Sequence, residues 1–379
     1  MTKRALGPWR IEPALFMQYT CTAVHMHVMH EGDADARGEQ NSRGRTRASR
    51  LRWGILSTAR IARERFIPGV RAGTEGEVVA IASREAGRAQ QVAAQLQIPR
   101  AYGSYEELLA DPEVEAVYIA LPNSLHVEWT IRAAQAGKHV LCEKPLARRA
   151  ADAVQAAEAC RQAGVLLMEA FMYRLHPQHA RALRLLADGT IGTSRLLRAS
   201  FCFAMSPQRR AAGDIRLSRP LEGGALMDVG CYTVNAARFL FGAEPVAVTA
   251  QMYVDPAFGV DTGFVATLAF PEGRLAVVDA SFDVAGPQRY EVAGDRGRIV
   301  VEPAFVPGSG PVQLAIVTGG ERRVEEVPGA DQYALEADHF ARCVRAGRLL
   351  PPAEDGVAQA KVIEALFQSA ETGQLVRLT

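Results

Sequence analysis

The sequence has few cysteines, almost no net charge and no long apolar run. Its six cysteines are scattered over 379 residues without a Cys-x-x-Cys pair, which argues against a disulfide framework or a zinc site and fits free thiols in a cytoplasmic protein. A formal net charge of +1 gives no electrostatic reason to expect nucleic acid or a membrane surface as a partner. No apolar stretch approaches the length of a membrane span. What remains is globular composition, 48% hydrophobic and 22% charged, in a chain long enough for two domains.

The first fifty residues differ from the rest of the chain. The stretch "ALFMQYTCTAVHMHVMH" is only patchily apolar and no twin-Arg pair precedes it, so it is a poor secretion signal. "HMHVMH" has the composition of a metal cluster, but composition alone rarely makes a site, and we expect no metal. We interpret residues 1–50 as a disordered leader or an over-extended gene start, outside the folded domains.

From Leu51 onward the chain alternates between apolar strands and amphipathic helices. Strand patterns run from "LRWGILS" and "EVVAIAS" through "VEAVYIALP" and "KHVLCEKP" to "VLLMEAF". Strands that are apolar throughout indicate a parallel sheet covered on both faces. Right-handed crossovers make such a sheet doubly wound, with its ligand edge at the carboxyl ends of the strands. We therefore predict an α/β protein whose NAD(P)-binding Rossmann domain covers residues 51–174.

The pattern changes after residue 190. Strand patterns from "SRLLRASFCFAM" to "VQLAIVTGG" follow one another with turns between them, interrupted by one helix near residues 226–240. Two more helical patterns follow, near residues 332–346 and 355–372. This succession predicts an α+β domain with an open antiparallel sheet over residues 175–379, whose last helices can pack back on the Rossmann domain.

The first strand–helix turn is a degraded dinucleotide fingerprint. Such a turn needs small residues so that backbone N–H groups can approach a pyrophosphate at a helix N-terminus. In "GILSTARIA", Ser57, Ala59 and Ala62 stand at the three fingerprint positions, and two of them depart from the pattern. A plain tight turn explains the stretch equally well on its own. On the nucleotide interpretation, the residues that meet the cofactor here are Ser57, Thr58, Ala59, Arg60 and Ile61.

The end of the second strand bears on which dinucleotide is bound. An NAD site usually has a carboxylate there for the ribose 2′-hydroxyl, whereas an Arg suits a 2′-phosphate. This chain has Ser83 and Arg84 instead of a carboxylate. A hydroxyl and a guanidinium suit a phosphate through charge-assisted hydrogen bonds, so NADP is favoured over NAD. The alternative is an Arg that merely ends an exposed strand.

The stretch "LCEKPLA" places two opposite charges, Glu143 and Lys144, at the end of an apolar strand. In the second domain, Asp228 and Tyr232 are four residues apart and therefore share one helix face. Gly223 and Gly224 give that helix a flexible entry, and Gly242 ends it. A Lys ammonium near the Tyr232 phenol would lower its pKa, so that the tyrosine could exchange a proton with a substrate hydroxyl.

Four motifs together resemble the glucose–fructose oxidoreductase / inositol dehydrogenase (Gfo/Idh/MocA) family. They are "EKP", the spacing "GG-x3-D-x-G-x-Y", the turn "ALPNSLH" and "EAFMYRLHPQ", within a resemblance that runs from about Leu51 to the C-terminus. Many members have His where Tyr232 stands. Tyr at that position resembles the branch with dihydrodiol dehydrogenase and NADP-dependent D-xylose dehydrogenase. The resemblance implies a Rossmann domain, an open-faced sheet domain and a homodimer or higher oligomer.

The resemblance also implies roles for single residues. Lys144 and Tyr232 match the catalytic pair, with Asp228 oriented toward the same site, and a sugar or cyclic polyol is the expected substrate. The remaining residues expected at the cofactor are Leu121, Pro122, Asn123, His126, Glu143 and Arg174. Within this set His126 is more often a structural residue, and "MYRLHP", with Arg174 and His176, can equally be a packed linker.

Simpler interpretations exist for the same residues. Lys144 and Glu143 can form a surface ion pair, and Tyr232 can be a core tyrosine with a satisfied hydroxyl. Their joint occurrence in one site favours an oxidoreductase acting on CH–OH groups. A sugar-nucleotide ketoreductase and a non-catalytic dinucleotide-binding regulator are the alternatives, and turnover of NADPH with a panel of carbonyl compounds separates the regulator from the enzymes.

The leader interpretation gives a first prediction. Because residues 1–50 lack a core pattern, a chain that starts at Arg50 should keep its melting temperature and its NADPH affinity within error. Differential scanning calorimetry and NADPH titration of the full and shortened chains test this. Loss of soluble protein on truncation would show that the leader belongs to the fold or to a subunit contact.

Overall fold

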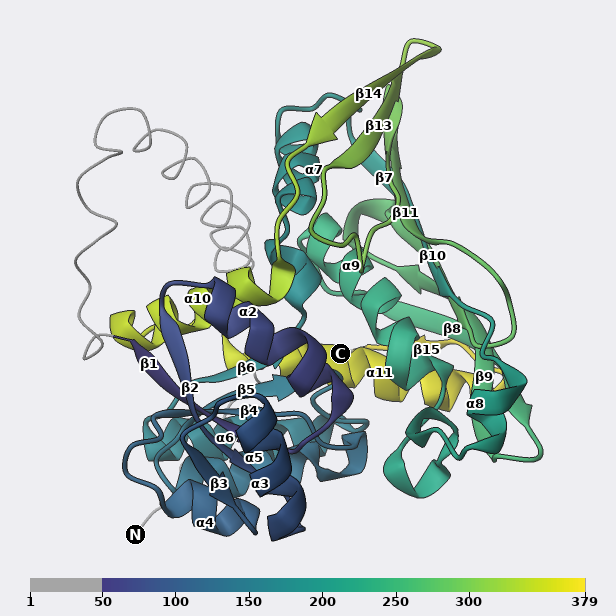
Figure 1. The fold of residues 1–379 in the computed structure, drawn as a ribbon. Coiled ribbons are helices and arrows are strands. Elements are labelled where there is room, and N and C mark those ends of the chain that lie inside the picture. Colours follow the sequence, from purple (N-terminus) through teal and green to yellow (C-terminus); the bar gives the residue numbers. More distant parts are fainter. Residues whose placement is uncertain (1–49, 379) are drawn as a thin grey trace, which may run out of the picture.

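The computed structural model describes residues 50–378, which form two sheets with helices on them (Figure 1). The leader before Arg50, with the "HMHVMH" stretch, lies outside the described residues. The first sheet is parallel throughout, in the order β3-β2-β1-β4-β5-β6. Its strands are β1 (Leu51–Leu56), β2 (Gly76–Ala82), β3 (Arg100–Tyr102), β4 (Ala116–Ile119), β5 (His139–Glu143) and β6 (Leu167–Ala170). This is the doubly wound order of a Rossmann domain, as predicted.

Helices connect these strands and cover both faces of the sheet. They are α2 (Ile67–Ala72) with the preceding π-helical turn η2 (Ala62–Phe66), α3 (Ala86–Gln95), α4 (Tyr105–Ala110), α5 (His126–Gln135) and α6 (Ala150–Ala163). Local signals set their ends: the Ser104 hydroxyl accepts a hydrogen bond from Glu107 N at the start of α4, and Gly164, with φ 69°, ends α6. The strand order reverses between β1 and β4, where such a sheet binds its ligand.

The second sheet has the order β14-β13-β12-β11-β7-β10-β9-β8-β15. Its strands are β7 (Ser194–Cys202), β8 (Ala247–Asp255), β9 (Val260–Ala269), β10 (Leu275–Ser281), β11 (Gln288–Gly294), β12 (Gly297–Val301), β13 (Val312–Thr318), β14 (Glu321–Val327) and β15 (Val376–Arg377). The prediction of an antiparallel sheet needs one correction, because β7 and β10 pair in parallel. Alternation of apolar and polar residues shows which face of a strand is buried but not the direction of its neighbour.

The helices of the second half are α7 (Pro177–Ala187), α8 (Pro207–Ala211), α9 (Cys231–Phe241), α10 (Gln332–Ala346) and α11 (Ala353–Thr372). Figure 1 shows α7, α9 and α11 on the face of the second sheet that turns toward the Rossmann domain. All residues of α9 are buried, so the helix that begins next to Asp228 is a core element. Val265 and Leu275, on the opposite face of the sheet, are about half exposed at 48% and 51%.

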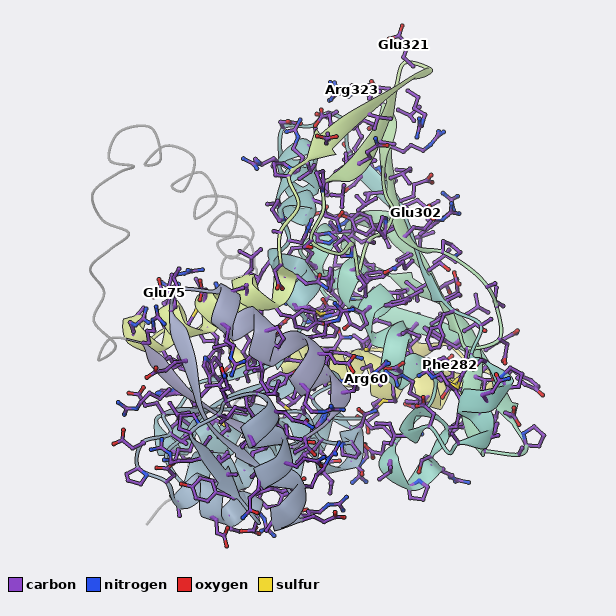
Figure 2. All side chains as sticks on the ribbon, viewed as in Figure 1. Arg60, Glu75, Phe282, Glu302, Glu321 and Arg323 are labelled. Carbon is purple, nitrogen blue, oxygen red and sulfur yellow. The ribbon has the colours of Figure 1, made fainter. Side chains whose placement is uncertain are left out.

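The last two long helices return to the Rossmann domain. Helix α10 packs on α2, and α11 packs on α6. Phe340 of α10 places its ring 5.3 Å from that of Trp53 on β1, and Trp53 contacts Phe66 edge to face at 5.2 Å. At the outer end of α10, Arg345 pairs with Glu75, which Figure 2 labels beside that helix. Residues from both ends of the described chain therefore complete one core.

Candidate active site

Lys144 joins the two halves of the molecule. It follows β5 directly, and its Nζ donates hydrogen bonds to the main-chain oxygen of Asp228 at 2.7 Å and to Asp228 Oδ1 at 3.3 Å. The same Nζ lies 4.9 Å from the centroid of the Tyr232 ring. The Lys144 side chain is only 11% exposed. The three residues predicted to be catalytic thus meet at the carboxyl edge of the parallel sheet, although they come from different domains.

Asp228 is held between two cations. It lies in the π-helical turn η7 (Leu226–Gly230) that precedes α9, and Arg216 Nε donates to its Oδ2 at 2.5 Å. Burial raises the pKa of Asp228, but Lys144 and Arg216 outweigh burial and lower it. Burial likewise opposes the charged form of Lys144, yet Asp228 and nearby acids raise the Lys144 pKa. Both groups are therefore ionised at neutral pH. Arg216, in an irregular stretch without a pattern, was not identified from the sequence.

The entry to η7 is rigid, where the sequence suggested a flexible one. Gly224 has φ 117°, and a Cβ on it would lie 2.2 Å from Asp261 Oδ1. The other oxygen of Asp261, Oδ2, accepts a hydrogen bond from Leu226 N at 2.7 Å. Glycine is needed here for a left-handed backbone and for close approach. Gly242 ends α9 with φ 58°, as predicted.

The environment of Tyr232 contradicts the expected low pKa. Its hydroxyl contacts Met172 Sδ at 3.4 Å, and its ring packs among Phe171, Phe201 and Phe305. Burial raises the pKa of Tyr232 well above 10, and neighbouring acids act in the same direction. The Lys144 ammonium faces the ring rather than the oxygen, so it forms a cation–π contact and does not stabilise a phenolate directly. Tyr232 therefore carries its proton at neutral pH.

Glu143 fixes the start of the "EKP" loop through two hydrogen bonds. Its Oε1 accepts a hydrogen bond from the Tyr118 hydroxyl, and its Oε2 accepts one from Lys144 N at 3.3 Å. Burial raises the pKa of Glu143, and the charge of Lys144 opposes this. Glu143 and Lys144 are both largely buried, which contradicts the interpretation as a surface ion pair.

The turn after β1 retains the backbone of a glycine turn without the glycines. Ser57 has φ 129°, a conformation that favours glycine, and its Oγ accepts a hydrogen bond from Ala59 N at 2.9 Å. Thr58 O accepts one from Arg63 Nε at 3.0 Å. The Arg60 side chain is 72% exposed, and Figure 2 shows it on the side of the Rossmann domain that faces the second domain. Ile61, half buried, packs against the cores of both domains.

Ser83 and Arg84 follow β2 at the same edge of the sheet. The Ser83 hydroxyl accepts a hydrogen bond from Glu85 N at 3.3 Å. Arg84 is exposed and lies close enough to Tyr105 to lower the pKa of that phenol against the effect of burial. Within residues 50–378 no carboxylate forms an ion pair with Arg84. Its guanidinium is therefore available to an anion.

The turn of Leu121, Pro122 and Asn123 is fixed by contacts within the protein. Asn123 Nδ2 donates to the main-chain oxygen of Glu222 at 2.8 Å, across the domain boundary. His126 is fully buried, and its two ring nitrogens lie 2.8 Å from Leu121 O and Pro145 O. Burial lowers the pKa of His126 while both carbonyls act against this. Since both ring nitrogens lie against these carbonyls, His126 ties this turn to the "EKP" loop.

Arg174 also differs from its predicted place. Its Nη1 pairs with Asp355 Oδ2 at 2.6 Å, its Nε donates to Asn235 Oδ1 at 2.8 Å, and its side chain is 3% exposed. Arg238 joins the same network through Asp355 at 3.0 Å. His176 caps α7, accepting at Nδ1 from Gln178 N at 3.3 Å. This geometry agrees with the linker interpretation of "MYRLHP", in which Arg174 is engaged within the protein.

Glu169, at the end of β6, was missed from the sequence. It is 8% exposed, and its Oε1 accepts a hydrogen bond from Leu146 N at 2.8 Å, two residues after Lys144. Burial raises the pKa of Glu169 to about 8. The "MEA" pattern gave no hint because a polar residue at a strand end is common. Glu169 therefore supports the "EKP" loop as a neutral acid.

Three further findings concern the described part of the chain. Between residues 50 and 378 no cluster of three or more His, Cys, Asp or Glu residues could hold a metal ion, and no helix in that range is long and apolar enough to cross a membrane. The five cysteines in that range are free thiols.

Comparisons with known proteins agree with this fold. The model of an oxidoreductase family with an NAD-binding Rossmann fold matches residues 51–171, and the C-terminal domain model of the same family matches residues 179–300. D-xylose 1-dehydrogenase (NADP(+)) 2 of Haloferax volcanii is 43% identical over 330 residues, which are 86% of this chain and 100% of that protein.

Solved structures give the same result. A 3-ketoreductase from Actinomadura kijaniata, crystallised with NADP and TDP-benzene, aligns with a TM-score of 0.80 at 34% identity, covering 84% of this chain and 98% of the other. An aldose–aldose oxidoreductase from Caulobacter crescentus, complexed with glycerol, aligns with a TM-score of 0.80 at 32% identity over 87% and 100% of the two chains.

Glu169 gives a prediction about pH. Its folded pKa of about 8 lies above the ordinary value of 4.5, so the native state holds a proton that the unfolded state releases. The full contribution of Glu169 to the free energy of unfolding is present below about pH 4.5. This contribution falls by up to about 1.4 kcal/mol per pH unit as the pH rises to 8. The glutamine of the Glu169→Gln variant stays neutral at every pH. The melting temperature of the variant minus that of the native protein should therefore increase between pH 5 and 8.5. Thermal unfolding across that range tests this, with Glu128→Gln on the surface as control, and a constant difference would contradict it.

Proposed function

The chain belongs to the Gfo/Idh/MocA oxidoreductase family, and from that premise we propose that it transfers a hydride between NADP and a C–OH/C=O centre of a sugar or cyclic polyol. The observation that carries the proposal is Lys144, which contacts Asp228 and Tyr232 together at the ligand edge of the parallel sheet. Because those contacts span two domains, they form only when the two domains pack against each other. Retention of both groups supports an enzyme over a non-catalytic regulator.

The residues at the sheet edge suit NADP. The positive φ of Ser57 supports a turn whose main-chain N–H groups can approach a pyrophosphate, over the stretch Ser57 to Ile61. Arg84, exposed and without an ion-pair partner between residues 50 and 378, suits a 2′-phosphate together with Ser83. Leu121, Pro122 and Asn123, with Glu143 and Lys144, would border the nicotinamide end. When bound, NADP supplies the hydride acceptor and NADPH the donor.

Lys144 is suited to bind the reacting oxygen. An ammonium has three N–H donors, and two of them go to Asp228. The third can donate to the substrate oxygen and stabilise negative charge that develops there. The Asp228–Arg216 pair holds the ammonium in place, because moving Lys144 would leave Asp228 partly unpaired.

Tyr232 is suited to donate a proton. Its phenol is buried and protonated, which matches the needs of carbonyl reduction, where the substrate oxygen takes up a proton as the carbon receives the hydride. In the oxidative direction Tyr232 must first lose its proton. Because burial favours the neutral phenol, oxidation should be slow at low pH. The two directions of the reaction should therefore have different pH optima.

The substrate class rests on the relatives. The Haloferax relative is named a D-xylose 1-dehydrogenase, and the Caulobacter structure is that of an aldose–aldose oxidoreductase. A sugar-nucleotide ketoreductase is the second candidate, favoured by the 0.80 TM-score to the Actinomadura 3-ketoreductase. A screen of NADPH oxidation with aldoses, cyclic polyol ketones and TDP-linked keto sugars separates the two.

The oligomeric state and the cellular compartment of the enzyme are further proposals. We infer a homodimer or higher oligomer through the outer face of the second sheet, because Val265 and Leu275 on that face are about half exposed. The free thiols fit a cytoplasmic protein, and no nucleic acid or membrane is expected as partner. Analytical ultracentrifugation of Val265→Arg, whose new charge should weaken such a contact, tests the oligomer.

Cofactor choice gives one prediction. Arg84→Ala removes the guanidinium assigned to the 2′-phosphate and should weaken NADP by about 1–3 kcal/mol, the range for a charge-assisted hydrogen bond, while NAD changes little. Isothermal titration with both cofactors measures this. Arg132→Ala, which removes an exposed arginine from α5, is the charge-matched control and should affect neither. Equal affinities of the native protein for NADP and NAD would overturn the assignment.

The chemistry gives another prediction. Tyr232→Phe removes one oxygen, so it should leave NADP binding intact and lower turnover by about 10²–10⁴-fold, the usual contribution of general acid–base catalysis. Lys144→Met should lower turnover similarly, because it removes the ammonium assigned to the substrate oxygen. Steady-state rates over pH 6–10 provide the test. If Tyr232→Phe turns over sugars at the native rate, the tyrosine is a packing residue and the mechanism is wrong.

A further inference from the structure

Arg216 contacts η7 through its main chain and through its side chain. The main-chain oxygen of Arg216 accepts a hydrogen bond from Gly224 N at 2.7 Å, just before η7 begins. A Cβ on Gly223 would lie 2.3 Å from the same oxygen, so this close approach requires glycine. Arg216 Nε donates to Asp228 Oδ2 inside η7. The irregular stretch around Arg216 therefore fixes both the entry of η7 and its carboxylate.

Asp214 holds Arg216 in turn. Its side chain caps the short turn η5 (Ile215–Leu217), where its Oδ1 accepts hydrogen bonds from Arg216 N at 3.1 Å and from Arg216 Nη1 at 3.3 Å. Its Oδ2 accepts a hydrogen bond from Arg209 Nη2 at 2.6 Å. Burial raises the pKa of Asp214, but the hydrogen bond from Arg216 N and the two arginines outweigh burial and lower it. Asp214 is therefore a carboxylate at neutral pH.

Five charged side chains of alternating sign lead from the surface to the site. In order they are Arg209, Asp214, Arg216, Asp228 and Lys144, and each lies within hydrogen-bonding distance of the next. The Arg209 side chain is 40% exposed, whereas that of Lys144 is 11% exposed. Isolated ion pairs at a surface stabilise a protein by little. Stability alone therefore does not account for a series of charges that ends on the ammonium assigned to the substrate oxygen.

The contacts of Asp228 indicate what Arg216 does for Lys144. Lys144 Nζ has three N–H donors, and the main-chain oxygen and Oδ1 of Asp228 accept two of them. Arg216 occupies the remaining oxygen of Asp228, Oδ2. Without the guanidinium, the carboxylate would be able to turn and offer both oxygens to the ammonium, since opposite charges that are shielded from water attract each other strongly. All three donors would then bind Asp228, and none would remain for a substrate.

We propose that Arg216 and Asp214 are positioning residues that keep one N–H donor of Lys144 free for the substrate oxygen, an inference that rests on the proposed role of Lys144. Arg216 holds Oδ2 of Asp228 away from the ammonium, and Asp214 holds the guanidinium of Arg216 in the orientation that this requires. Both residues act through Asp228 and Lys144, and neither contacts substrate or cofactor. The irregular segment before η7 is therefore part of the catalytic apparatus.

Arg216→Met tests the inner contact, since it removes the guanidinium and keeps an apolar side chain. The reaction is D-xylose with NADP, or a TDP-linked keto sugar with NADPH if the screen favours the ketoreductase. We expect kcat to fall about 10-fold to 100-fold, somewhat less than the loss of a whole oxyanion donor. Arg216→Lys returns a cation to the side of Asp228, so it should recover part of this loss. The NADP Kd should stay native in both variants, because neither change touches the cofactor.

Asp214→Asn tests the outer contact. It keeps an acceptor for Arg216 N and removes only the charge, so kcat should fall about threefold to fivefold, the upper range for a partly exposed ion pair. Added to Arg216→Met it should have almost no effect on kcat, because Asp214 acts through Arg216. Asp188→Asn is the matched control. Asp188 Oδ1 likewise accepts a hydrogen bond from the main-chain N two residues later, at Thr190, but Asp188 lies at the end of α7, and the kcat of this variant should be native.

A second background separates positioning from a general loosening of the site. Lys144→Met has no ammonium left to position, so adding Arg216→Met to it should change the residual kcat by less than about twofold. An equal loss in this background and in the native one would overturn the proposal, and so would a native kcat in both Arg216→Met and Asp214→Asn. If Asp214→Asn does not fold, the Arg216 variants decide the matter. The proposed function would fail separately, through a native rate in Tyr232→Phe.

Discussion

One buried cation, the ammonium of Lys144, determines how the two domains meet. An ammonium that is 11% exposed is tolerable only with hydrogen bonds and an opposite charge, and both come from Asp228 of the other domain. Asp228 in turn needs Arg216, and the turn that holds Asp228 needs Gly224 and its contact with Asp261. Each requirement depends on the one before it, so the two domains are aligned by charge compensation as well as by apolar packing.

A second group of buried charges joins three other elements of the molecule. Arg174, Arg238 and Asp355 are almost completely buried, and they connect η4 (Met172–Leu175), α9 and α11 through ion pairs of 2.6 and 3.0 Å. Removing one member would leave a buried charge unpaired, which is strongly destabilising. The sequence alone does not show that the guanidinium of Arg174 takes part in these buried ion pairs.

The parts of the fold and site that the sequence predicted are those with a repeating or local signal. The parallel sheet follows from uninterrupted apolar strands, and α9, α10 and α11 follow from helical spacing. Lys144, Asp228 and Tyr232 were recognised by residue type and motif, and the structure places them in contact. The direction in which the pKa of Tyr232 shifts could not be predicted, because it depends first on burial and then on neighbouring acids, which the residue type does not reveal. Arg216 and Glu169 matter through contacts with residues far away in the chain, and no local pattern encodes these. The parallel pairing of β7 with β10 likewise depends on the topology of the sheet, which the alternation of apolar and polar residues does not encode.

The return of α10 to the Rossmann domain has a consequence for synthesis of the chain. The aromatic face of the first sheet, with Trp53 and Phe66, is closed by Phe340, so the 169 residues from Met172 to Phe340 must be made before that face is covered. At ribosomal rates of about 5–20 residues per second this takes roughly 10–30 s. During that interval the nascent Rossmann half presents an uncovered apolar surface, which is the kind of surface that chaperones bind. The domain that comes first along the chain is therefore among the last to be finished.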